Sequence, residues 1–218
     1  MVNLYLIRHG RQSSQLCNVD VELSREGIIQ SELLRDRICQ YDIDALYSSN
    51  LIRAVHTADI INQKLNLIHE TSEDLKEISF GLLEGKTEQY INEHFRDYTK
   101  EQFDFIDDIP YPEGENGTSV YERAMPVILD IVQSGKKNIA IVTHGGLIRV
   151  LLAAFFGKSQ ARRQLFGLSL ENTSITHLAY NPDSDRFYLE RFNDFAHLEA
   201  HPELLRKMVN QSNKQYHG

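Results

Sequence analysis

Short apolar segments alternate along this chain with segments of helical periodicity, and this alternation restricts the possible folds. The clearest apolar segment, NIAIVT at residues 138–143, is typical of a central strand in a parallel sheet. Alternating strands and helices build a sheet that is covered on both faces. We therefore predict an α/β fold: a three-layer sandwich whose mostly parallel central sheet lies between helices. The predicted strands cover residues 2–7, 44–48, 138–143, 174–180 and 187–192, and the helical patterns cover residues 23–38, 51–65, 118–132 and 146–156.

One long segment interrupts this alternation. Residues 80–116 have no convincing strand signal, and they combine many acidic residues with several Phe and Tyr residues. The segment ends in YPEGENG, whose Pro and Gly are typical of turns. We predict a mainly helical cap, inserted at about residues 80–117 into a single domain that spans residues 1–218. Residues 201–218 predict one short helix and a frayed polar tail.

The composition excludes several classes of function. The chain has a net charge of -8 at pH 7 and no basic run, so we expect neither a nucleic-acid nor a membrane partner. No apolar run is long enough to cross a bilayer, and the N-terminus lacks the pattern of a signal peptide. Cys17 and Cys39 suggest neither a zinc motif nor a disulfide framework, which favours free thiols and a cytoplasmic location.

Cationic and imidazole side chains gather where the predicted strands end. Arg8 and His9 follow the first strand, Arg53 lies early in the helix after the second strand, and His144 with Gly145 follows residues 138–143. Taken alone, Arg8-His9 and Arg53 would be read as ordinary surface residues, and His144 with Gly145 would fit a structural or a functional role equally. Ligands of open α/β sheets bind beyond the carboxyl ends of the strands, so we expect these groups in one pocket. Two guanidinium groups, two imidazoles and the free N–H groups of a helix N-terminus suit a phosphoryl group.

The chain carries no metal-ligand motif and no GxxxxGK[ST] loop. We therefore expect no metal and no other cofactor at the predicted pocket. Phosphoryl transfer still needs a nucleophile in line with the leaving group. Without a metal-activated water, a side chain has to serve, and neutral histidine is suited to this role.

At this point the sequence resembles the histidine phosphatase superfamily, which includes the cofactor-dependent phosphoglycerate mutases. The resemblance covers nearly the whole chain. RHG alone is a weak signal, but several blocks occur in the order and at the spacings of that family. These blocks are LIRHG, LSREG, LYSSNLIRAVHTA, LKEISFGLLEG, VTHGGLIRVLL, ENTSIT and FNDFAHL.

The resemblance implies a role for each candidate residue. His9 would be the nucleophile and would become phosphohistidine, and Glu77 in LKEISFG would be the proton donor. A carboxyl group suits that task because it can protonate the leaving oxygen and then, once ionised, activate water. Glu84 is the rival carboxylate, and we expect it to be structural. The phosphate pocket would be lined by Arg8, Arg53, His144 and the backbone N–H of Gly145.

The chain departs from the family pattern at several positions. Arg11 follows RHG where many relatives have an acidic or neutral polar residue. It would either add a cation at the mouth of the pocket or face solvent, and we favour the solvent-facing position. Relatives often have Asn a few residues after the nucleophile. Gln15 aligns with that Asn and is our candidate phosphate ligand, with nearby Asn18 as the alternative. His56 replaces another polar residue, and we expect it to pack in its helix.

The cap argues for a phosphatase among the activities of the family. A mutase needs clustered cations to hold a second anion, whereas residues 80–116 offer only Lys86, Arg96 and Lys100, and the pair Arg162-Arg163 lies outside this segment. We expect a histidine acid phosphatase-type phosphomonoesterase that acts on a small phosphorylated metabolite. A phosphoglycerate mutase and a non-catalytic phosphate-binding module are the alternatives. The cap aromatics would contact the leaving group or form the cap's own core, and nothing in the sequence sets the oligomeric state.

Overall fold

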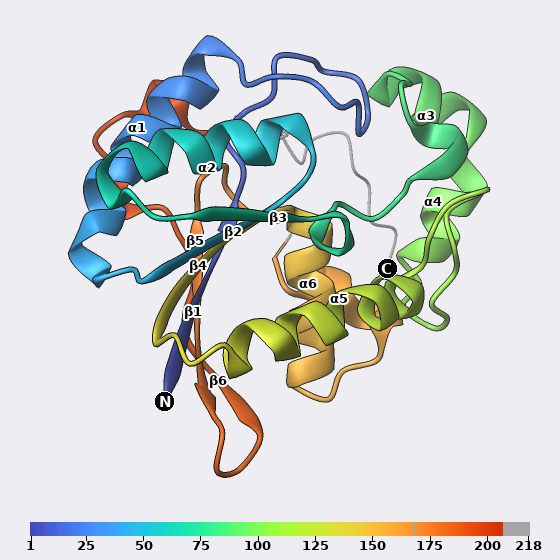
Figure 1. Cartoon of the computed structure of the whole chain (residues 1–218). Coiled ribbons are helices and arrows are strands. Elements are labelled where there is room, and N and C mark those ends of the chain that lie inside the picture. The colour runs from blue at the N-terminus through green and yellow to red at the C-terminus, as the bar shows by residue number, and fades with distance from the viewer. Residues whose placement is uncertain (168, 207–218) are drawn as a thin grey trace.

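A six-stranded mixed sheet forms the centre of the molecule (Figure 1). The computed structural model describes residues 1–167 and 169–206. The strand order is β3-β2-β4-β1-β5-β6; β1 to β4 pair in parallel, and β5 and β6 add antiparallel strands at one edge. The strands are β1 (Val2–Arg8), β2 (Ala45–Ser49), β3 (His69–Ser72), β4 (Asn138–Thr143), β5 (Ile175–Asn181) and β6 (Arg186–Asp194).

Helices cover both faces of this sheet, as predicted. Leu4 and Leu6 point into a core shared with α5 (Gly117–Gln133) and α6 (Gly145–Phe155), whereas Tyr5 and Ile7 point into the core on the opposite face. This alternation follows from the two-residue period of a strand, and because both faces are covered, the central residues of β1 and β4 are apolar. The second core is completed by α1 (Arg25–Ile38) and α2 (Ile52–Leu65).

Local sequence signals explain where the helices begin. The hydroxyl of Ser24 accepts a hydrogen bond from Gly27 N at 3.1 Å, which confirms its predicted role as the cap of α1. Asn116 and Ser119 form a reciprocal capping box that starts α5. Short 3-10 helices complete the fold: η1 (Cys39–Tyr41), η2 (Glu73–Leu75), η3 (Gly81–Leu83), η4 (Gln160–Leu165), η5 (Ala196–Leu198) and η6 (Pro202–Leu204).

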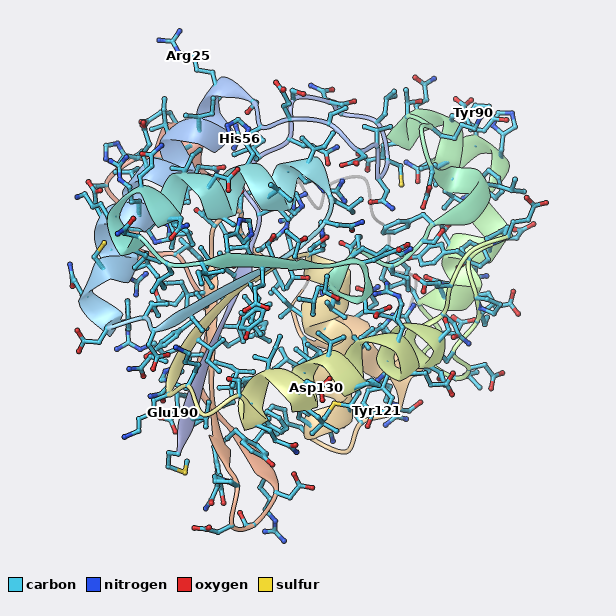
Figure 2. All side chains as sticks on the ribbon, in the orientation of Figure 1. Arg25, His56, Tyr90, Tyr121, Asp130 and Glu190 are labelled. Carbon is cyan, nitrogen blue, oxygen red and sulfur yellow. The ribbon has the colours of Figure 1, made fainter. Side chains whose placement is uncertain are left out.

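The predicted cap segment is helical. It contains α3 (Glu88–His94) and α4 (Arg96–Gln102), which lie at one end of the molecule next to the start of α5 (Figure 1). The rings of Tyr98 and Phe80 pack on Tyr111, with centroid distances of 5.6 and 4.6 Å. Tyr90 instead stacks on His94 at the outer end of the cap (Figure 2). These contacts support the packing interpretation of the cap aromatics.

The two ends of the cap meet at a narrow neck, formed by residues 79–81 and 111–115. Glu115 N donates to Ser79 O at 3.0 Å, and Ser79 N donates to a carboxylate oxygen of Glu115 at 2.8 Å. Gly81 has a φ of +52°, and a side chain there would collide with Pro112 O. Glycine therefore allows the two backbones to approach closely at the neck.

The structure corrects one detail of the predicted elements. Strand β3 was not predicted, because its sequence HETS is polar and the strand lies at the sheet edge next to β2. Within the described part of residues 201–218, the structure has the short η6, and the rest of that predicted segment, residues 207–218, lies outside the described residues. Within residues 1–167 and 169–206, no helix has the length and apolar character needed to cross a membrane.

Candidate active site

His9 lies immediately beyond β1, buried with 5% of its surface exposed. Its Nδ1 is 2.7 Å from Gly10 O, and Arg53 Nε is 3.2 Å from its Nε2. A carbonyl oxygen only accepts and a guanidinium only donates, so Nδ1 carries the proton and Nε2 carries the lone pair. The fold therefore presents His9 as the tautomer whose nucleophilic nitrogen faces the other predicted site residues.

The backbone of His9 is held by a loop that the sequence analysis did not assign. Asn172 Nδ2 donates to His9 O at 2.9 Å, and Thr173 N donates to Arg8 O at 2.9 Å. Thr173 has a φ of +57°, which is costly for a β-branched residue. This strained conformation aims the Thr173 N–H at the end of β1, and the only sequence signal for it was the block ENTSIT.

Arg53 is buried in the first turn of α2, with 2% of its surface exposed. Its Nη2 donates to Asn18 Oδ1 at 2.7 Å, and its Nη1 donates to Val19 O at 3.1 Å. These hydrogen-bond partners are neutral, and the carboxylate of Asp20 forms a long ion pair with Arg53 Nη1 at 4.0 Å. The structure thus places Asn18 beside this charge, whereas Gln15 is exposed.

His144 and Gly145 form the opposite wall. His144 is fully buried, and its ring centroid is 5.0 Å from that of His9. Neither ring nitrogen of His144 has a hydrogen-bond partner among the described residues. A buried imidazole without a partner is costly unless a ligand oxygen completes it. Gly145 is the first residue of α6, so its N–H belongs to a helix N-terminus, which favours an anion.

Glu77 lies at the same site. Its Oε2 accepts from Gly146 N at 3.2 Å, and its Oε1 accepts from Ile78 N at 3.0 Å. A side chain at position 146 would collide with the Glu77 carboxylate, which explains the second glycine of HGG. Glu84 instead accepts from Phe80 N at 2.9 Å and from Asn18 Nδ2 at 3.0 Å. These bonds support the structural role expected of Glu84.

Arg123 on α5 holds the segment that carries Glu77. Its Nη2 donates at 3.1 Å to the carbonyl oxygens of both Lys76 and Glu77, and its Nη1 donates to Asp74 O at 2.6 Å. Its Nε forms an ion pair with Glu115 at 2.7 Å. One guanidinium therefore joins the Glu77 segment to the end of the cap. Sequence reasoning missed Arg123 because its partners lie far away in the chain.

Several other candidate residues lie elsewhere. Arg11 Nη2 donates to Leu204 O at 2.6 Å, so the prediction that Arg11 faces solvent is wrong. His56 is half-buried on α2 (Figure 2).

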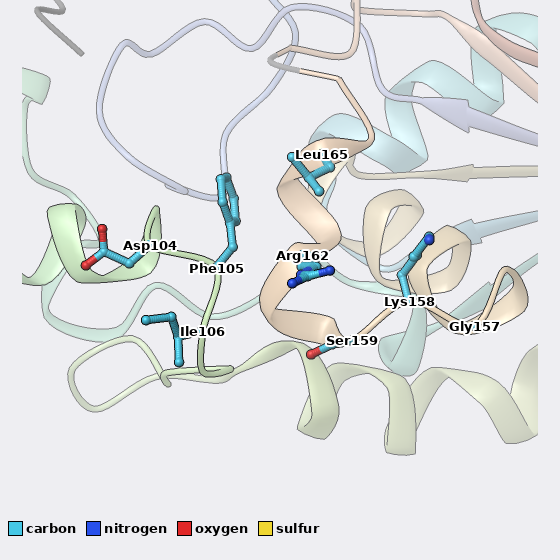
Figure 3. Close-up of a pocket in the computed structure, with 8 residues that line it drawn as sticks. All are labelled: Asp104, Phe105, Ile106, Gly157, Lys158, Ser159, Arg162 and Leu165. Carbon is cyan, nitrogen blue, oxygen red and sulfur yellow. The ribbon is translucent and has the colours of Figure 1, made fainter. Parts of the chain in front are cut away.

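Arg163 follows the cap in sequence but contacts it in space, through an ion pair with Asp108 at 2.7 Å. Its neighbour Arg162 lines a surface pocket of about 690 Å³ between η4 and residues 104–106 (Figure 3).

The structure adds cations that the analysis of the cap did not include. Arg149 lies on α6 one turn after Gly145, and Arg206 follows η6; their charges and those of Arg8 and Glu77 act on one another. A spacing of four residues on one helix was the available signal for Arg149. Within the residues that the structure describes, no cluster of three or more His, Cys, Asp or Glu side chains could hold a metal ion.

Burial controls the charge state of the histidines. Desolvation, followed by the nearby charge of Arg53, lowers the pKa of His9 well below 6.5. Desolvation and neighbouring charges likewise lower the pKa of His144. Both imidazoles are therefore neutral at pH 7, which keeps the lone pair of His9 available for attack. Burial also lowers the pKa of His197, to about 4.

These lowered pKa values predict acid sensitivity of the fold. Below pH 6.5, His9, His144 and His197 bind protons in the unfolded chain but stay neutral in the folded protein. The free energy of unfolding therefore falls as the pH falls. Each histidine that stays neutral should contribute a loss of roughly 1.4 kcal/mol per pH unit. Urea denaturation in phosphate-free buffer at pH 7 and pH 5 measures this. Equal stability at the two pH values would contradict the assignment of neutral histidines.

The chain is similar in sequence to proteins that are named as a phosphatase and as a phosphoglycerate mutase. The putative phosphoserine phosphatase 2 of Hydrogenobacter thermophilus is 27% identical over 183 residues, which cover 82% of this chain and 89% of that protein. The probable phosphoglycerate mutase GpmB of Yersinia pestis is 28% identical over 211 residues, covering 91% and 96%.

Solved structures with a similar fold also include proteins that are named as phosphatases. Mycobacterial glucosyl-3-phosphoglycerate phosphatase in complex with inorganic phosphate has a TM-score of 0.81 and 25% identity, covering 90% of this chain and 99% of that chain. Phosphoserine phosphatase from Entamoeba histolytica, a mutant bound to phosphoserine, has a TM-score of 0.77 and 29% identity, covering 91% and 100%. The model of the histidine phosphatase superfamily (branch 1) matches residues 4–194, and the chain therefore belongs to this superfamily.

Proposed function

We propose that the chain is a metal-independent phosphomonoester hydrolase of the histidine acid phosphatase type, which acts on a small phosphorylated metabolite through a phosphohistidine intermediate. The observation that carries this proposal is the unprotonated Nε2 of His9, buried beside the Arg53 guanidinium and the unpartnered His144 ring. Relatives and structural neighbours named as phosphatases support it.

The first step forms the phosphoenzyme. His9 Nε2 attacks phosphorus, and the bond between phosphorus and the alcohol oxygen breaks. Glu77 protonates that oxygen as it leaves, because an alkoxide is a poor leaving group. Charge on the equatorial oxygens is met by preorganised donors, which cost no reorganisation during the reaction. These donors are Arg8, Arg53, His144 and the backbone N–H of Gly145.

The second step returns the enzyme to its starting state. Glu77 is now ionised, and its carboxylate takes a proton from a water molecule that attacks the phosphohistidine. The bond between phosphorus and Nε2 breaks, the lone pair returns to His9, and inorganic phosphate leaves. The same carboxyl group thus donates one proton and then accepts one. Two hydrogen bonds from backbone N–H groups, at 3.0 and 3.2 Å, hold this carboxyl group in place.

A phosphoglycerate mutase is the alternative, supported by the similarity to GpmB. In a mutase, a phosphoglycerate oxygen takes the place of water in the second step. We favour hydrolysis because the cap supplies little charge: Arg96 and Lys100 are exposed, and Arg163 is neutralised by Asp108. The non-catalytic binding module ranks last, because the chain carries both His9 and Glu77. A panel of phosphomonoesters, with 3-phosphoglycerate isomerisation measured in parallel, separates the three functions.

Metal independence gives a direct prediction. Guanidinium groups and helix N–H groups supply the positive potential that metal ions supply in other phosphoryl-transfer enzymes, so EDTA should leave the hydrolysis rate unchanged. Vanadate can adopt the five-coordinate geometry of the transferring phosphoryl group and should inhibit competitively. Steady-state rates with each reagent test this. Loss of activity in EDTA that a divalent ion restores would overturn the proposal.

Two further properties belong to the same proposal. A small phosphomonoester is the partner that the site suits, and we propose neither a nucleic-acid nor a membrane partner for this acidic chain. Cys17 and Cys39 are free thiols, which supports a reducing compartment such as the cytoplasm.

A further inference from the structure

The sequence block FNDFAHL, residues 192–198, takes no part in the proposed mechanism, but it lies against the segment that supports His9. That segment is the block ENTSIT, residues 171–176, and its Thr173 is fully buried. His197 on η5 connects the two blocks, because its Nε2 lies 3.0 Å from Thr173 Oγ1. FNDFAHL therefore reaches the proposed nucleophile through one intervening segment.

The other ring nitrogen of His197 fixes the direction of this hydrogen bond. Nδ1 lies 3.3 Å from Arg37 Nη1, and a guanidinium only donates, so Nδ1 accepts. In the neutral ring the proton is then on Nε2, which donates to Thr173 Oγ1. Burial, followed by the charge of Arg37, lowers the pKa of His197 to about 4, so the ring is neutral at pH 7.

Arg37 on α1 is itself held by a carboxylate of the same block. Both of its Nη groups donate to Asp194, and the two side chains are largely buried. Asp194 Oδ1 also accepts from Ala196 N at 3.1 Å. A bidentate pair of this kind fixes the orientation of the guanidinium as well as its distance. Arg37 is therefore held where it can donate to the ring of His197.

The hydroxyl of Thr173 connects this network to the end of β1. Its Oγ1 accepts from His197 Nε2 and donates to Asn172 O at 2.7 Å. These two bonds hold the side chain while φ is +57°, a conformation that a β-branched residue seldom adopts. In this conformation Thr173 N donates to Arg8 O at 2.9 Å. The neighbouring Asn172 Nδ2 donates to His9 O, also at 2.9 Å.

The position of the His9 ring depends on the backbone that residues 171–176 hold. Its Nδ1 is bonded to Gly10 O, so the ring moves with its own peptide segment. A displacement of about 1 Å can slow an enzyme by about 10²-fold, because attack requires aligned reacting atoms. We propose that His197 is a positioning residue, which donates to Thr173 and thereby keeps the His9 backbone in the geometry for attack on phosphorus. This role rests on the proposed hydrolase function.

The rate of the first turnover tests this role. Release of p-nitrophenol from p-nitrophenyl phosphate in the first turnover reports attack by His9. His197→Met removes the donor and keeps a side chain of similar size, and it should lower this rate by about 10- to 100-fold. Competitive inhibition by inorganic phosphate should change by less than about threefold, because Arg53 on α2 and Gly145 on α6 belong to other elements.

A conservative variant separates the hydrogen bond from the bulk of the ring. His197→Gln retains an N–H donor at a comparable distance from the backbone, so it should recover most of the rate that His197→Met loses. The control is His177→Met, which removes a half-buried histidine from β5. His177 Nε2 lies 3.0 Å from Asn3 Oδ1, near the start of β1, and this variant should keep the wild-type rate.

A double variant shows whether His197 acts through Thr173. Thr173→Val removes the hydroxyl that receives the hydrogen bond and should slow the first turnover to a similar extent as His197→Met. Once the hydroxyl is absent, loss of the donor should matter little. Adding His197→Met to Thr173→Val should therefore slow the reaction further by less than about threefold.

Three results would overturn the proposal. The first is a wild-type rate in His197→Met or in Thr173→Val, and Thr173→Val decides the question where His197→Met does not fold. The second is an equal loss in His197→Gln and His197→Met. The third is a full additional loss in the double variant. Failure of the hydrolase function looks different, since the wild-type protein would then show no continuing release of inorganic phosphate, whatever the variants do.

Discussion

Replacement of His9 by alanine is expected to abolish phosphatase turnover, with a loss of at least about 10⁴-fold in kcat. The variant loses the Nε2 lone pair that attacks phosphorus, and no other described imidazole lies beside Arg53 in the same way. His144, whose ring centroid is 5.0 Å away, has no bond that fixes its tautomer and cannot replace it.

Phosphate transfer provides a second readout for this variant. Wild-type protein quenched during turnover should carry an acid-labile, base-stable phosphate on one histidine, and the alanine variant should carry none. His56→Ala is a suitable control, because His56 is a half-buried histidine on α2 outside the site. If His9→Ala keeps substantial activity, or still becomes phosphorylated, then His9 is not the nucleophile.

The second large effect is expected for Glu77→Gln. Glutamine keeps the shape of the side chain and can still accept from Gly146 N or from Ile78 N, although not from both, and it cannot give a proton to the leaving oxygen. Hydrolysis of alkyl phosphates should slow by about 10²- to 10⁴-fold. Hydrolysis of p-nitrophenyl phosphate should slow much less, provided that phosphoenzyme formation limits the rate, because this leaving group needs little protonation.

Glu84→Gln is the matched control for that experiment. Glu84 accepts from backbone and side-chain groups through one oxygen, and a glutamine oxygen can accept the same bonds. The control should behave as wild type with both kinds of substrate. If the leaving-group dependence appears in Glu84→Gln and is absent in Glu77→Gln, then Glu84, and not Glu77, is the proton donor.

Much of the fold could be predicted from the sequence, because the interactions that determine these strands and helices are made between residues close in the chain. The strand at 138–143 was predicted to the residue, since a buried parallel strand has to be apolar along its length. Ser24 was recognised as a cap because capping requires only the next few residues. Strand β3 was missed because an edge strand of polar residues has no apolar pattern, and its pairing with β2 determines it.

The candidate site likewise has a part that could be predicted from the sequence and a part that could not. His9, Arg53 and His144 were predicted to be neighbours from the topological rule that strand ends of an α/β sheet meet, and the structure brings them together. Asn18 and Gln15 could not be separated, because an irregular loop carries them and Asn18 adopts a positive φ of 45°. Contacts made over long sequence separations, such as those of Arg123, left no local signal.

The neck of the cap has a consequence for how this enzyme family can diversify. Ser79, Glu115 and Arg123 bind the two ends of the insertion to each other and to the backbone of Glu77, the proposed proton donor, through contacts that do not involve the residues between those ends. Doubling the length of a closed loop costs only about 0.6 kcal/mol. We therefore expect that the intervening residues can be lengthened, shortened or exchanged as one unit without moving Glu77, so that members of the family can differ in this segment while the position of this carboxyl group is kept.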